Sequence, residues 1–490
     1  MDKESFCKIT HTKRFLNLAL PGAGVIFIAI FFYLIFSKNY LFALLLFVIL
    51  LFAIFFLFQD YFLKICSKIK IQSILKLLFW LTIVTAITGA SFLAIPFGPL
   101  HILPFRLFLV LILLLIIMQI LLNKGQLIIP TKNIRYYLLF LFIWFCYAVL
   151  TLLWVRSKTN ALQHIFFILI GLLIILLNVL CLKDIKNLKR FYILWLIITI
   201  CLLIMGLWEH STGNHLPISC SYEVKRPDIR IMPTGTFHNT NDYSTFLALS
   251  IPFILSWLHY QRGLLKNILG IILLGFSSYF IIINLSRGGL LAEILEICVF
   301  LLFLTRLKIN LKLILSLCLA VIVLHFLAPD FIPKTANEIS ISISESPTRR
   351  IELVKSGLFY LYQSFGFGVG AGNIEWHIAT FSPYHTYGTL NLHNWWIEIL
   401  ADYGIFIFIG YLAFYFGLIN NLWKAWRHAS VQEKLICESI LLSLIGFPLT
   451  SLSPSSIMGF EPHWLIFGFA LAFLNYYRIY YPKVKTVQTI

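Results

Sequence analysis

The first residues of chemical interest form a polar motif around an arginine. Arg230 precedes a run of Thr, His and Asn side chains that ends at Asp242. Its guanidinium could form two hydrogen bonds to one phosphate, and Asn239 and Asn241 could donate hydrogen bonds to sugar hydroxyls. The structural alternative is a loop in which Asn241 or Asp242 caps the following helix. The spacing alone favours that alternative.

A second arginine lies in the short turn Asn-Leu-Ser-Arg-Gly-Gly (284–289), between two apolar segments. The two glycines after Arg287 would allow another backbone to approach closely. If the apolar segments cross a membrane, the turn holds Arg287 in the headgroup layer, where the diphosphate of a lipid-linked substrate would lie. An arginine that reaches the phosphates of ordinary lipids explains the motif equally well.

Two further arginines, Arg349 and Arg350, precede the glycine run Gly-Phe-Gly-Val-Gly-Ala-Gly-Asn (366–373). The run resembles a nucleotide-binding loop only superficially, because it follows no βαβ unit. The functional interpretation is a flexible loop that approaches a bulky ligand, with the arginines as further anion contacts. The alternative is a loop without a ligand.

A histidine suited to proton transfer begins the motif His-Asn-Trp-Trp (393–396). His393 precedes an apolar segment, and the positive end of a helix dipole there would disfavour its protonated form. A neutral imidazole is what a general base needs near pH 7. Asn394, Trp395 and Trp396 could contact sugars, although an interfacial aromatic belt is the better explanation of the two tryptophans.

Four carboxylates lie inside apolar segments, in two pairs at helical spacing. Glu293 and Glu296 are three residues apart, and Glu398 and Asp402 are four apart. Ionisable groups at membrane depth are candidates for acid–base chemistry, and paired structural charges are the alternative. No His/Cys cluster has the sequence spacing of a zinc site. We therefore expect arginines to take the role of a metal, and we expect no cofactor.

Long apolar segments separate these motifs, and the composition of the chain indicates a membrane protein. Of its 490 residues, 60% are hydrophobic and 12% are charged, whereas a soluble domain has roughly 45–50% and about 25%. Soluble enzymes and disordered proteins are excluded, and unbroken apolar runs such as 41–58 do not fit the alternating strands of a membrane β-barrel. The sequence predicts an all-α polytopic membrane protein.

A helix needs about 20 apolar residues to cross a bilayer, and the sequence offers fourteen such segments, or twelve or thirteen spans if one early or late segment is re-entrant. They are 15–36, 40–58, 74–95, 103–122, 134–155, 161–182, 190–208, 243–260, 266–284, 288–305, 311–328, 396–419, 434–452 and 462–480. We divide the chain into an N-terminal transmembrane bundle (1–208), an outer loop and helices with arginine motifs (209–328), a large extracytoplasmic loop (329–395) and C-terminal transmembrane helices (396–490).

The basic residues give these segments an orientation. The formal net charge is +18, and a positive-inside bias explains it better than nucleic-acid binding does. With the N-terminus in the cytoplasm, 25 Lys and Arg side chains lie inside and 11 lie outside. Both termini are then cytoplasmic, and the four motifs lie on the extracytoplasmic side.

The large extracytoplasmic loop contains an apolar stripe at helical spacing, formed by Ile351, Val354, Leu358 and Leu361. The stripe predicts a short helix that either lies on the outer membrane surface or packs over the transmembrane bundle. Cys220 is the one cysteine placed clearly outside, so we expect no intramolecular disulfide.

In their order and spacing, the motifs resemble the O-antigen ligase and polymerase superfamily of bacterial envelope glycan assembly. The matching pieces are Arg230 with Gly-Thr-Phe-His-Asn-Thr-Asn (235–241), Ser-Arg-Gly-Gly (286–289), Arg349 or Arg350 with Gly-Val-Gly-Ala-Gly (368–372), and His-Asn-Trp-Trp (393–396). The resemblance covers about 205–410. Within the superfamily it is greatest to polymerases of teichuronic acid repeats in Gram-positive bacilli.

The resemblance implies a GT-C-like fold and metal-independent glycosyl transfer on the outer face of a bacterial plasma membrane. The donor would be an oligosaccharide on undecaprenyl diphosphate, with its leaving diphosphate held by Arg230, Arg287 and Arg349 or Arg350. His393 would activate the hydroxyl of a lipid-linked acceptor. Membrane lipids, a flippase and a chain-length protein would be partners, and nucleic acid would not.

Two other functions are compatible with the sequence. A ligase that transfers finished glycan to another acceptor would use the same site, because the difference lies in the acceptor groove. A lipid-linked oligosaccharide flippase or other transporter would also have twelve to fourteen helices. Transporters, however, bury charged residues near the midplane and often contain internal repeats, whereas the notable residues here cluster in external loops.

Overall fold

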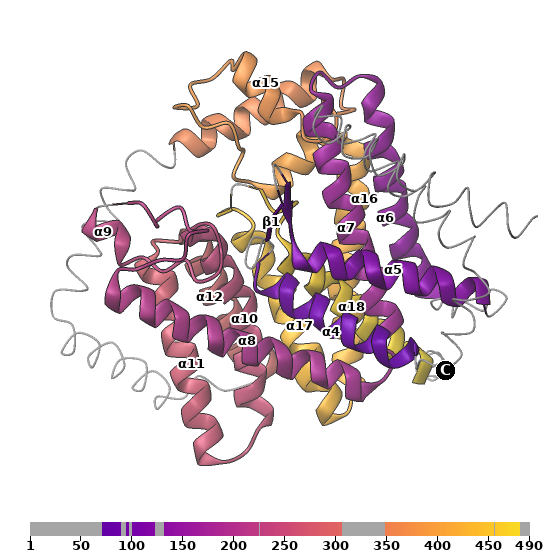
Figure 1. Cartoon of the computed structure of the whole chain (residues 1–490), viewed down its shortest axis with the longest axis vertical. Helices are drawn as coiled ribbons and strands as arrows, with labels where there is room; N and C mark the ends of the chain where they lie inside the picture. The colour runs from indigo at the N-terminus through magenta and orange to yellow at the C-terminus, as the bar shows by residue number, and fades with distance from the viewer. Residues whose placement is uncertain are drawn as a thin grey trace, which may run out of the picture. The chain divides into compact units, whose positions relative to one another are not determined.

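The chain is a polytopic helical membrane protein, and its computed structural model describes residues 71–89, 95–97, 100–122, 132–224, 226–305, 348–454 and 456–480. In this part, five helices are long and apolar enough to cross a membrane. They are α6 (Lys132–Leu150, extended by a 3-10 turn, Thr151–Leu153), α7 (Lys158–Cys181), α8 (Ile185–Thr212), α11 (Leu264–Ile283) and α16 (Trp395–His428) (Figure 1).

Further helices and two strands complete the described part. They are α4 (Ile71–Ile87), β1 (Ile95–Phe97), β2 (Leu100–Ile102), α5 (Pro104–Leu122), α9 (Pro227–Arg230), α10 (Thr240–Tyr260), α12 (Arg287–Val299, continued by a π-helical turn, Phe300–Leu304), a helix over 348–363, α15 (Ile374–Thr380), α17 (Val431–Thr450) and α18 (Glu461–Tyr480). The contacts described below lie within one compact unit, residues 76–120 and 125–490.

Eleven of the fourteen predicted segments coincide with these helices, and the other three (15–36, 40–58 and 311–328) fall outside the described residues. One boundary is wrong, because the segment predicted at 74–95 stops being helical at Ile87. Gly89 has a φ of +91°, and an added Cβ there would lie 3.3 Å from the carbonyl oxygen of Thr236. The chain then enters the antiparallel pair β1–β2, with Ile95 opposite Ile102.

The centre of the unit consists of α10, α17 and α18, whose residues are buried on almost every side. Small and polar side chains let these helices approach one another. The Ser443 hydroxyl donates to the carbonyl of Leu249 at 3.0 Å and joins α17 to α10, and a Cβ on Gly171 of α7 would overlap the Trp464 ring of α18. In contrast, α6 and α11 expose large apolar side chains, as lipid-facing helices do.

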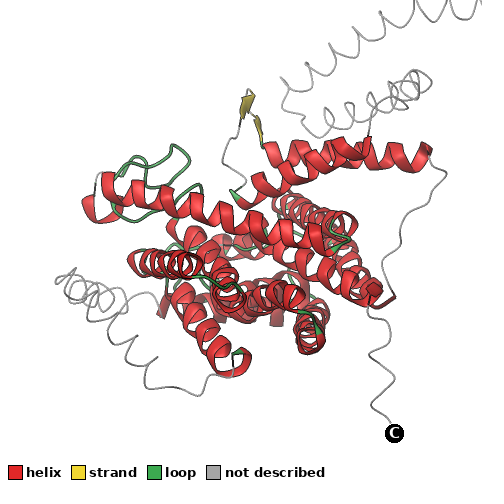
Figure 2. Ribbon diagram, turned by 90° about the horizontal axis from the view of Figure 1, so that it is seen from below, coloured by secondary structure: helices red, strands yellow, loops and turns green. Residues whose placement is uncertain are grey.

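The sequence motifs all lie at one end of the helices. The amide of Asn284, after α11, donates to the carbonyl of Thr240 at the start of α10 at 3.3 Å. The backbone N–H of Trp395 at the start of α16 donates to Ser451 O after α17, also at 3.3 Å. Figure 2 shows the long loop after α8 in green at the end of that helix. The opposite helix ends are joined by the short connections 182–184, 261–263 and 429–430.

The helix over 348–363 packs through a face other than the predicted apolar stripe. Leu353 and Tyr360 are buried and form a cluster with Val369, Ile374, Ile378, Leu392 and Ala401. Ile351 and Leu358 of the stripe are instead 54% and 44% exposed. The helix therefore packs on the neighbouring loop and α16 through one face, whereas Ile351 and Leu358 of the stripe are exposed and Val354 and Leu361 are half-buried. Contact of this stripe with the membrane surface stays a prediction.

Candidate functional site

His393 has an unusual backbone conformation directly before α16. Its φ is +48°, in a region that residues other than glycine rarely adopt. Its Nδ1 lies 3.2 Å from the carbonyl oxygen of Pro454. Because a carbonyl can only accept a hydrogen bond, Nδ1 carries the proton, and Nε2 keeps the lone pair that could accept a proton from a substrate.

The surroundings of His393 favour its neutral form. Burial lowers the pKa of its imidazole, and the positive charges of Arg350 and Arg349 lower that pKa further, against the opposing effect of the carbonyls of Ser453 and Pro454. The ring is therefore neutral near pH 7, which is the state a general base requires.

Three arginines gather beside this histidine from two distant segments. Arg287 is the first residue of α12, and Arg349 and Arg350 lie in the first turn of the helix over 348–363. Burial lowers the pKa of Arg350, and so do the charges of Arg287 and Arg349. Within the part of the chain that the structure describes, the charges that shift the pKa of Arg350 are both positive. A bound anion would relieve this repulsion, so the arrangement suits a diphosphate.

The loop after α17 connects the arginine turn with the histidine. The Ser286 hydroxyl donates to Ser453 Oγ at 3.3 Å. A Cβ on Gly288 would overlap Ser453 Oγ and lie 2.6 Å from the carbonyl of Leu449, so the glycine expected to permit close approach does so toward this loop. This loop was not expected to belong to the site. The sequence feature that could have indicated it is the polar run Ser-Leu-Ser-Pro-Ser-Ser (451–456) between two apolar segments.

Arg230 is held by a different set of contacts. Its Nε donates to the carbonyl of Gly213 at 2.8 Å, and its Nη2 donates to Asn214 Oδ1 at 3.4 Å. Arg230 is not among the charges that act on Arg350 or His393. The structure therefore brings together Arg287, Arg349, Arg350 and His393, and Arg230 stays with the loop after α8.

A buried carboxylate that sequence reasoning missed organises that loop. Glu209, at the end of α8, is fully buried and accepts hydrogen bonds from the backbone N–H groups of Thr234 (2.8 Å) and Gly235 (2.6 Å). It also lies 3.2 Å from His215 Nδ1. Burial acts to lower the pKa of His215, but the hydrogen bonds to Glu209 and to the carbonyl of Arg230, together with the charge of Glu209, outweigh burial, and the pKa is raised.

Two asparagines expected to contact sugars serve as helix caps. Asn239, rather than Asn241 or Asp242, caps α10, because its Oδ1 accepts the N–H of Asp242 at 2.9 Å. Asn394 caps α16, and its Oδ1 accepts the N–H groups of Trp396 and Ile397 at 3.1 and 3.3 Å. The contact of Asn239 confirms that the motif around Arg230 is a loop that caps the next helix. The capping residue is Asn239, and the expectation of Asn241 or Asp242 was wrong.

The two tryptophans of the histidine motif pack inside the protein. Trp395 is 1% exposed, and its Nε1 donates to the hydroxyl of Tyr411 at 2.9 Å. The Nε1 of Trp396 donates to Ser451 Oγ at 3.1 Å. Trp395 has no free ring face for a sugar, so the expected stacking is wrong for this residue. The burial of Trp395 also differs from the aromatic belt that we preferred, whereas Trp396 is half-buried and the belt stays a prediction for it.

The glycine run 366–373 wraps around α16 rather than forming a flexible loop. A Cβ on Gly368 would lie 2.5 Å from the carbonyl of Asp402. The carboxylate of Asp402 accepts the N–H groups of Gly372 (3.0 Å), Asn373 (3.1 Å) and Ile374 (2.9 Å). Asp402 therefore fixes the run and the start of α15, which is a structural role for a residue considered for acid–base chemistry.

The other carboxylates inside apolar segments have separate surroundings. The Ser278 hydroxyl donates to Glu293, and Ser456 Oγ donates to Glu398 at 2.8 Å. Both carboxylate oxygens of Glu296 are buried without a hydrogen-bond partner in the described part of the chain. Glu293 and Glu398 remain candidates for proton transfer.

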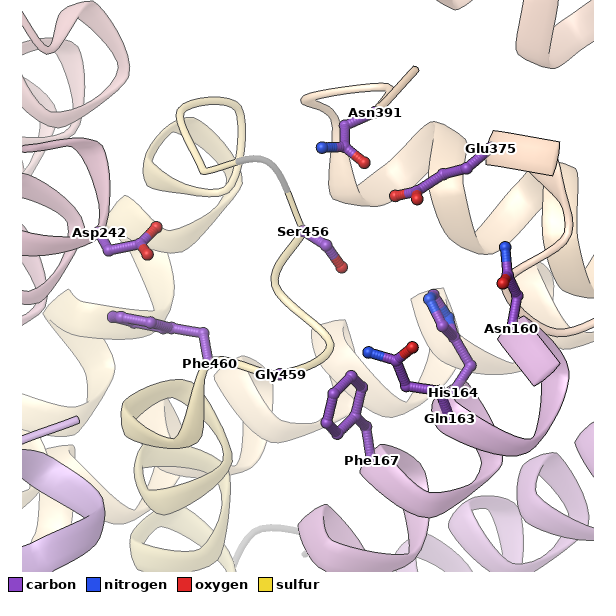
Figure 3. Close-up of a pocket in the computed structure, with 10 residues that line it drawn as sticks. All are labelled: Asn160, Gln163, His164, Phe167, Asp242, Glu375, Asn391, Ser456, Gly459 and Phe460. Carbon is purple, nitrogen blue, oxygen red and sulfur yellow. The ribbon is translucent and has the colours of Figure 1, made fainter. Parts of the chain in front are cut away.

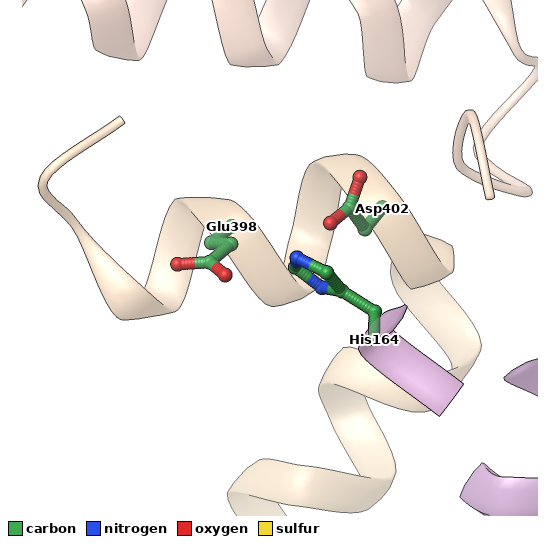
Figure 4. Close-up of side chains that lie close together, drawn as sticks. All are labelled: His164, Glu398 and Asp402. Atoms are coloured by element: carbon green, nitrogen blue, oxygen red, sulfur yellow. The ribbon is translucent and has the colours of Figure 1, made fainter. Parts of the chain in front are cut away.

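One cluster of side chains could hold a metal ion. His164 of α7 lies between Glu398 and Asp402 of α16, and one ligand atom of each falls within 4.8 Å of the others (Figure 4). A cation bonded at roughly 2.0–2.5 Å to each would span such separations. Asp402 already accepts three backbone hydrogen bonds, which leaves it fewer free lone pairs. These three residues are distinct from Arg287, Arg349 and Arg350, which we call the arginine group.

Comparisons with known proteins give the family to which the chain is similar. Residues 269–412 match the family described as O-Antigen ligase. The chain is also similar to the teichuronic acid biosynthesis protein TuaE of Bacillus subtilis (strain 168), with 32% identity over 359 residues, which cover 70% of this chain and 72% of the relative. The matched family region contains Arg287, Arg349, Arg350 and His393, and Arg230 lies before it.

Proposed function

The chain belongs to the O-antigen ligase family, and on this premise we propose that it polymerises undecaprenyl-diphosphate-linked oligosaccharide repeats. It is an enzyme of the membrane glycosyltransferase type, with a polymerase or ligase role in the synthesis of a cell-envelope polysaccharide. The name of the similar Bacillus protein supports teichuronic acid as the candidate product.

The observation that carries this proposal is the position of Arg350 beside Arg287, Arg349 and His393. The acceptor hydroxyl oxygen attacks the anomeric carbon of the donor sugar, the bond from that carbon to the diphosphate breaks, and the electron pair leaves on the phosphate oxygen. The guanidinium groups stabilise this developing negative charge. His393 Nε2 takes the proton of the acceptor hydroxyl.

The reaction takes place on the outer face of the plasma membrane in this proposal. The helix ends that carry the arginines and His393 are opposite those joined by 182–184, 261–263 and 429–430. The segments at those opposite ends carry the basic residues that a cytoplasmic side collects, such as Lys183 and Arg262. Both termini are cytoplasmic in the same arrangement.

Chain growth in proteoliposomes tests the proposal. We expect His393→Ala to lower the rate of polymerisation of lipid-linked repeats by about 10²–10⁴-fold, the usual contribution of a general base. The control is His385→Ala, which changes an exposed histidine in the same loop and should keep the wild-type rate. An unchanged rate for His393→Ala would reject its catalytic role.

The products of the same assay separate the candidate functions. Growth of the glycan by whole repeats identifies a polymerase. A single transfer of glycan to an acceptor of another kind identifies a ligase, and transbilayer movement of lipid-linked repeats without a new glycosidic bond identifies a transporter. The last result would overturn the proposal.

Removal of divalent cations tests metal independence. Because arginines neutralise the leaving diphosphate in this proposal, treatment with EDTA should leave the rate within about twofold of the untreated enzyme. A rate that falls with EDTA and returns with one divalent cation would contradict this part of the proposal. That result would direct attention to His164, Glu398 and Asp402.

A further inference from the structure

A pocket of about 330 Å³ lies beside the site and takes no part in the steps above. Its walls come from α7, α10, α15, the segment before α16 and the loop before α18. Figure 3 shows the carboxylates of Asp242 and Glu375 on opposite sides of the space, with His164 and Phe167 below Glu375.

The pocket shares two chain segments with the candidate catalytic histidine. Asn391 lines the pocket and is two residues before His393, so their Cα atoms are at most about 7 Å apart. Ser456 also lines it and is two residues after Pro454, whose carbonyl bonds to His393. The pocket is therefore close to His393 along two chain segments, although His393 itself does not line it.

The lining has the composition of a site for a hydroxyl-rich ligand. Amide side chains of Asn160 and Gln163 offer both donors and acceptors, and the carboxylates offer further acceptors. Phe167 and Phe460 supply apolar surface. A few placed polar groups with aromatic walls are typical of small-molecule sites, and a sugar ring presents hydroxyl edges and an apolar face.

One buried atom in the pocket wall points to a missing partner. The Nδ1 of His164 is inaccessible to solvent and has no hydrogen-bond partner among the residues that the structure describes. Buried polar atoms are rarely left in this state. His164 lines the pocket, and a ligand hydroxyl could reach this Nδ1 only if the ring turned, because the atom is closed to the pocket in this structure.

The charge of the pocket is opposite to that of the arginine group. Its lining contains Asp242 and Glu375, and it contains no Lys or Arg among the described residues. A carboxylate on a ligand would be repelled by these side chains in a partly buried space, where charge interactions are stronger than in water. An uncharged sugar would instead accept or donate hydrogen bonds.

We propose that this pocket binds the terminal sugar of the acceptor glycan, and that Asp242 and Glu375 select an uncharged hexose or N-acetylhexosamine over a hexuronate. The proposal rests on the proposed function, since it assigns the acceptor side of the same transfer. The arginine group would then hold the anionic donor, and this pocket would hold the neutral end of the chain that accepts it.

Equilibrium binding gives a readout that does not require turnover. The probes are two free disaccharides that differ only in their non-reducing sugar, an N-acetylhexosamine or a hexuronate, titrated into the purified full-length protein. We expect wild type to bind the uncharged probe about tenfold or more tightly. The double variant Asp242→Asn with Glu375→Gln should reduce this preference to about twofold, and Glu352→Gln, a carboxylate paired with Lys355 outside the pocket, should keep it.

A second variant guards against failure of the double variant to fold. Gln163→Ala removes an exposed side chain that lines the pocket, and should weaken binding of the uncharged probe by about tenfold while the melting temperature stays unchanged. Equal binding of the two probes by wild type, or unchanged affinity in Gln163→Ala, would overturn the pocket proposal.

The binding and polymerisation assays on the wild-type protein together separate the pocket proposal from the proposed function. If wild type prefers the uncharged probe but joins no repeats, the pocket assignment stands as a sugar site and the proposed function fails. If wild type polymerises but binds both probes equally, the proposed function stands and the pocket assignment fails.

Discussion

At the scale of single residues, the account depends on the protonation state of His393. Burial and the charge of Arg350 lower the pKa of its imidazole, and Arg349 contributes less. An unperturbed histidine titrates near 6.5, so a lowered pKa keeps the base neutral, and the enzyme active, to a more acidic pH. Removal of a positive neighbour should reverse part of this effect.

The pH profile of kcat/KM measures that effect. With Arg350→Gln, the pKa of His393 should rise, and the acidic limb of the profile should move to higher pH. Arg349→Gln should move it in the same direction by a smaller amount, because its influence is the weaker of the two. No movement, or movement to lower pH, would show that His393 is not the titrating base.

The two arginines that sequence reasoning treated alike should differ in effect. Arg287→Gln should raise the KM for the lipid-linked donor by about tenfold or more, the usual effect of losing a charge-assisted hydrogen bond to phosphate. Arg230→Gln should raise it less, because the charge of Arg230 acts on neither Arg350 nor His393. Steady-state kinetics with limiting donor measures both, and equal effects would contradict the grouping of charges found in the structure.

Residue types and their order were enough to select His393, Arg287, Arg349 and Arg350 as a candidate site. They were not enough to show which polar side chains face a substrate, because capping and burial depend on contacts with distant segments. Asn239 and Asn394 are used by their own helices, and Trp395 is enclosed by residues from distant segments, such as Trp144 and His463. Glu209 and His164 had no motif around them, so only packing reveals what they touch.

At the scale of elements, close packing of α12 against the end of α17 positions the arginine turn. A side chain on Gly288 would collide with Ser453 and with the carbonyl of Leu449, which belongs to the backbone and cannot turn away. Gly288→Ala should therefore destabilise the protein by about 1–3 kcal/mol, as overpacking does, and should lower the rate of transfer.

Thermal unfolding in detergent measures the loss of stability in Gly288→Ala, and the polymerisation assay measures the lower transfer rate. The matched control is Gly275→Ala in α11, where no other atom lies within 4 Å of the added Cβ. The control should keep the stability and rate of wild type or increase the stability slightly, because alanine favours a helix over glycine by about 1 kcal/mol. Equal melting temperatures for the two variants would refute the proposed packing.

The helices themselves could be predicted from apolar segment lengths, because a helix that crosses a membrane needs a long apolar run. Their ends were harder to predict. Hydropathy alone extended the segment 74–95 through Gly89, where the backbone turns. It also gave no indication that the helix over 348–363 would pack through Leu353 and Tyr360 and leave Ile351 exposed.

At the scale of the whole molecule, the account requires that all site segments lie outside the cell. The distribution of basic residues predicts this orientation from sequence alone. The connections 182–184, 261–263 and 429–430 lie at the helix ends opposite the site, which agrees with this orientation. Sequence could not predict that three distant segments meet beside one loop, since their contacts depend on how the helices pack together.

Labelling of cysteines in intact cells tests the orientation. Cys220, an exposed free thiol in the loop after α8, should react with a membrane-impermeant maleimide before the cells are opened. Lys183 is exposed in the connection 182–184, at the helix ends opposite the site. In a background without other cysteines, the Lys183→Cys variant should react only after permeabilisation. The reverse pattern would place the arginines and His393 in the cytosol and would exclude the proposed reaction.

The most direct test of the central claim is an experimental structure of the full-length protein with undecaprenyl diphosphate bound. The account predicts that the diphosphate lies within hydrogen-bonding distance of Arg287 and Arg350, with His393 Nε2 facing the space beside it. A diphosphate bound elsewhere, with these guanidinium groups far from any phosphate oxygen, would contradict the account.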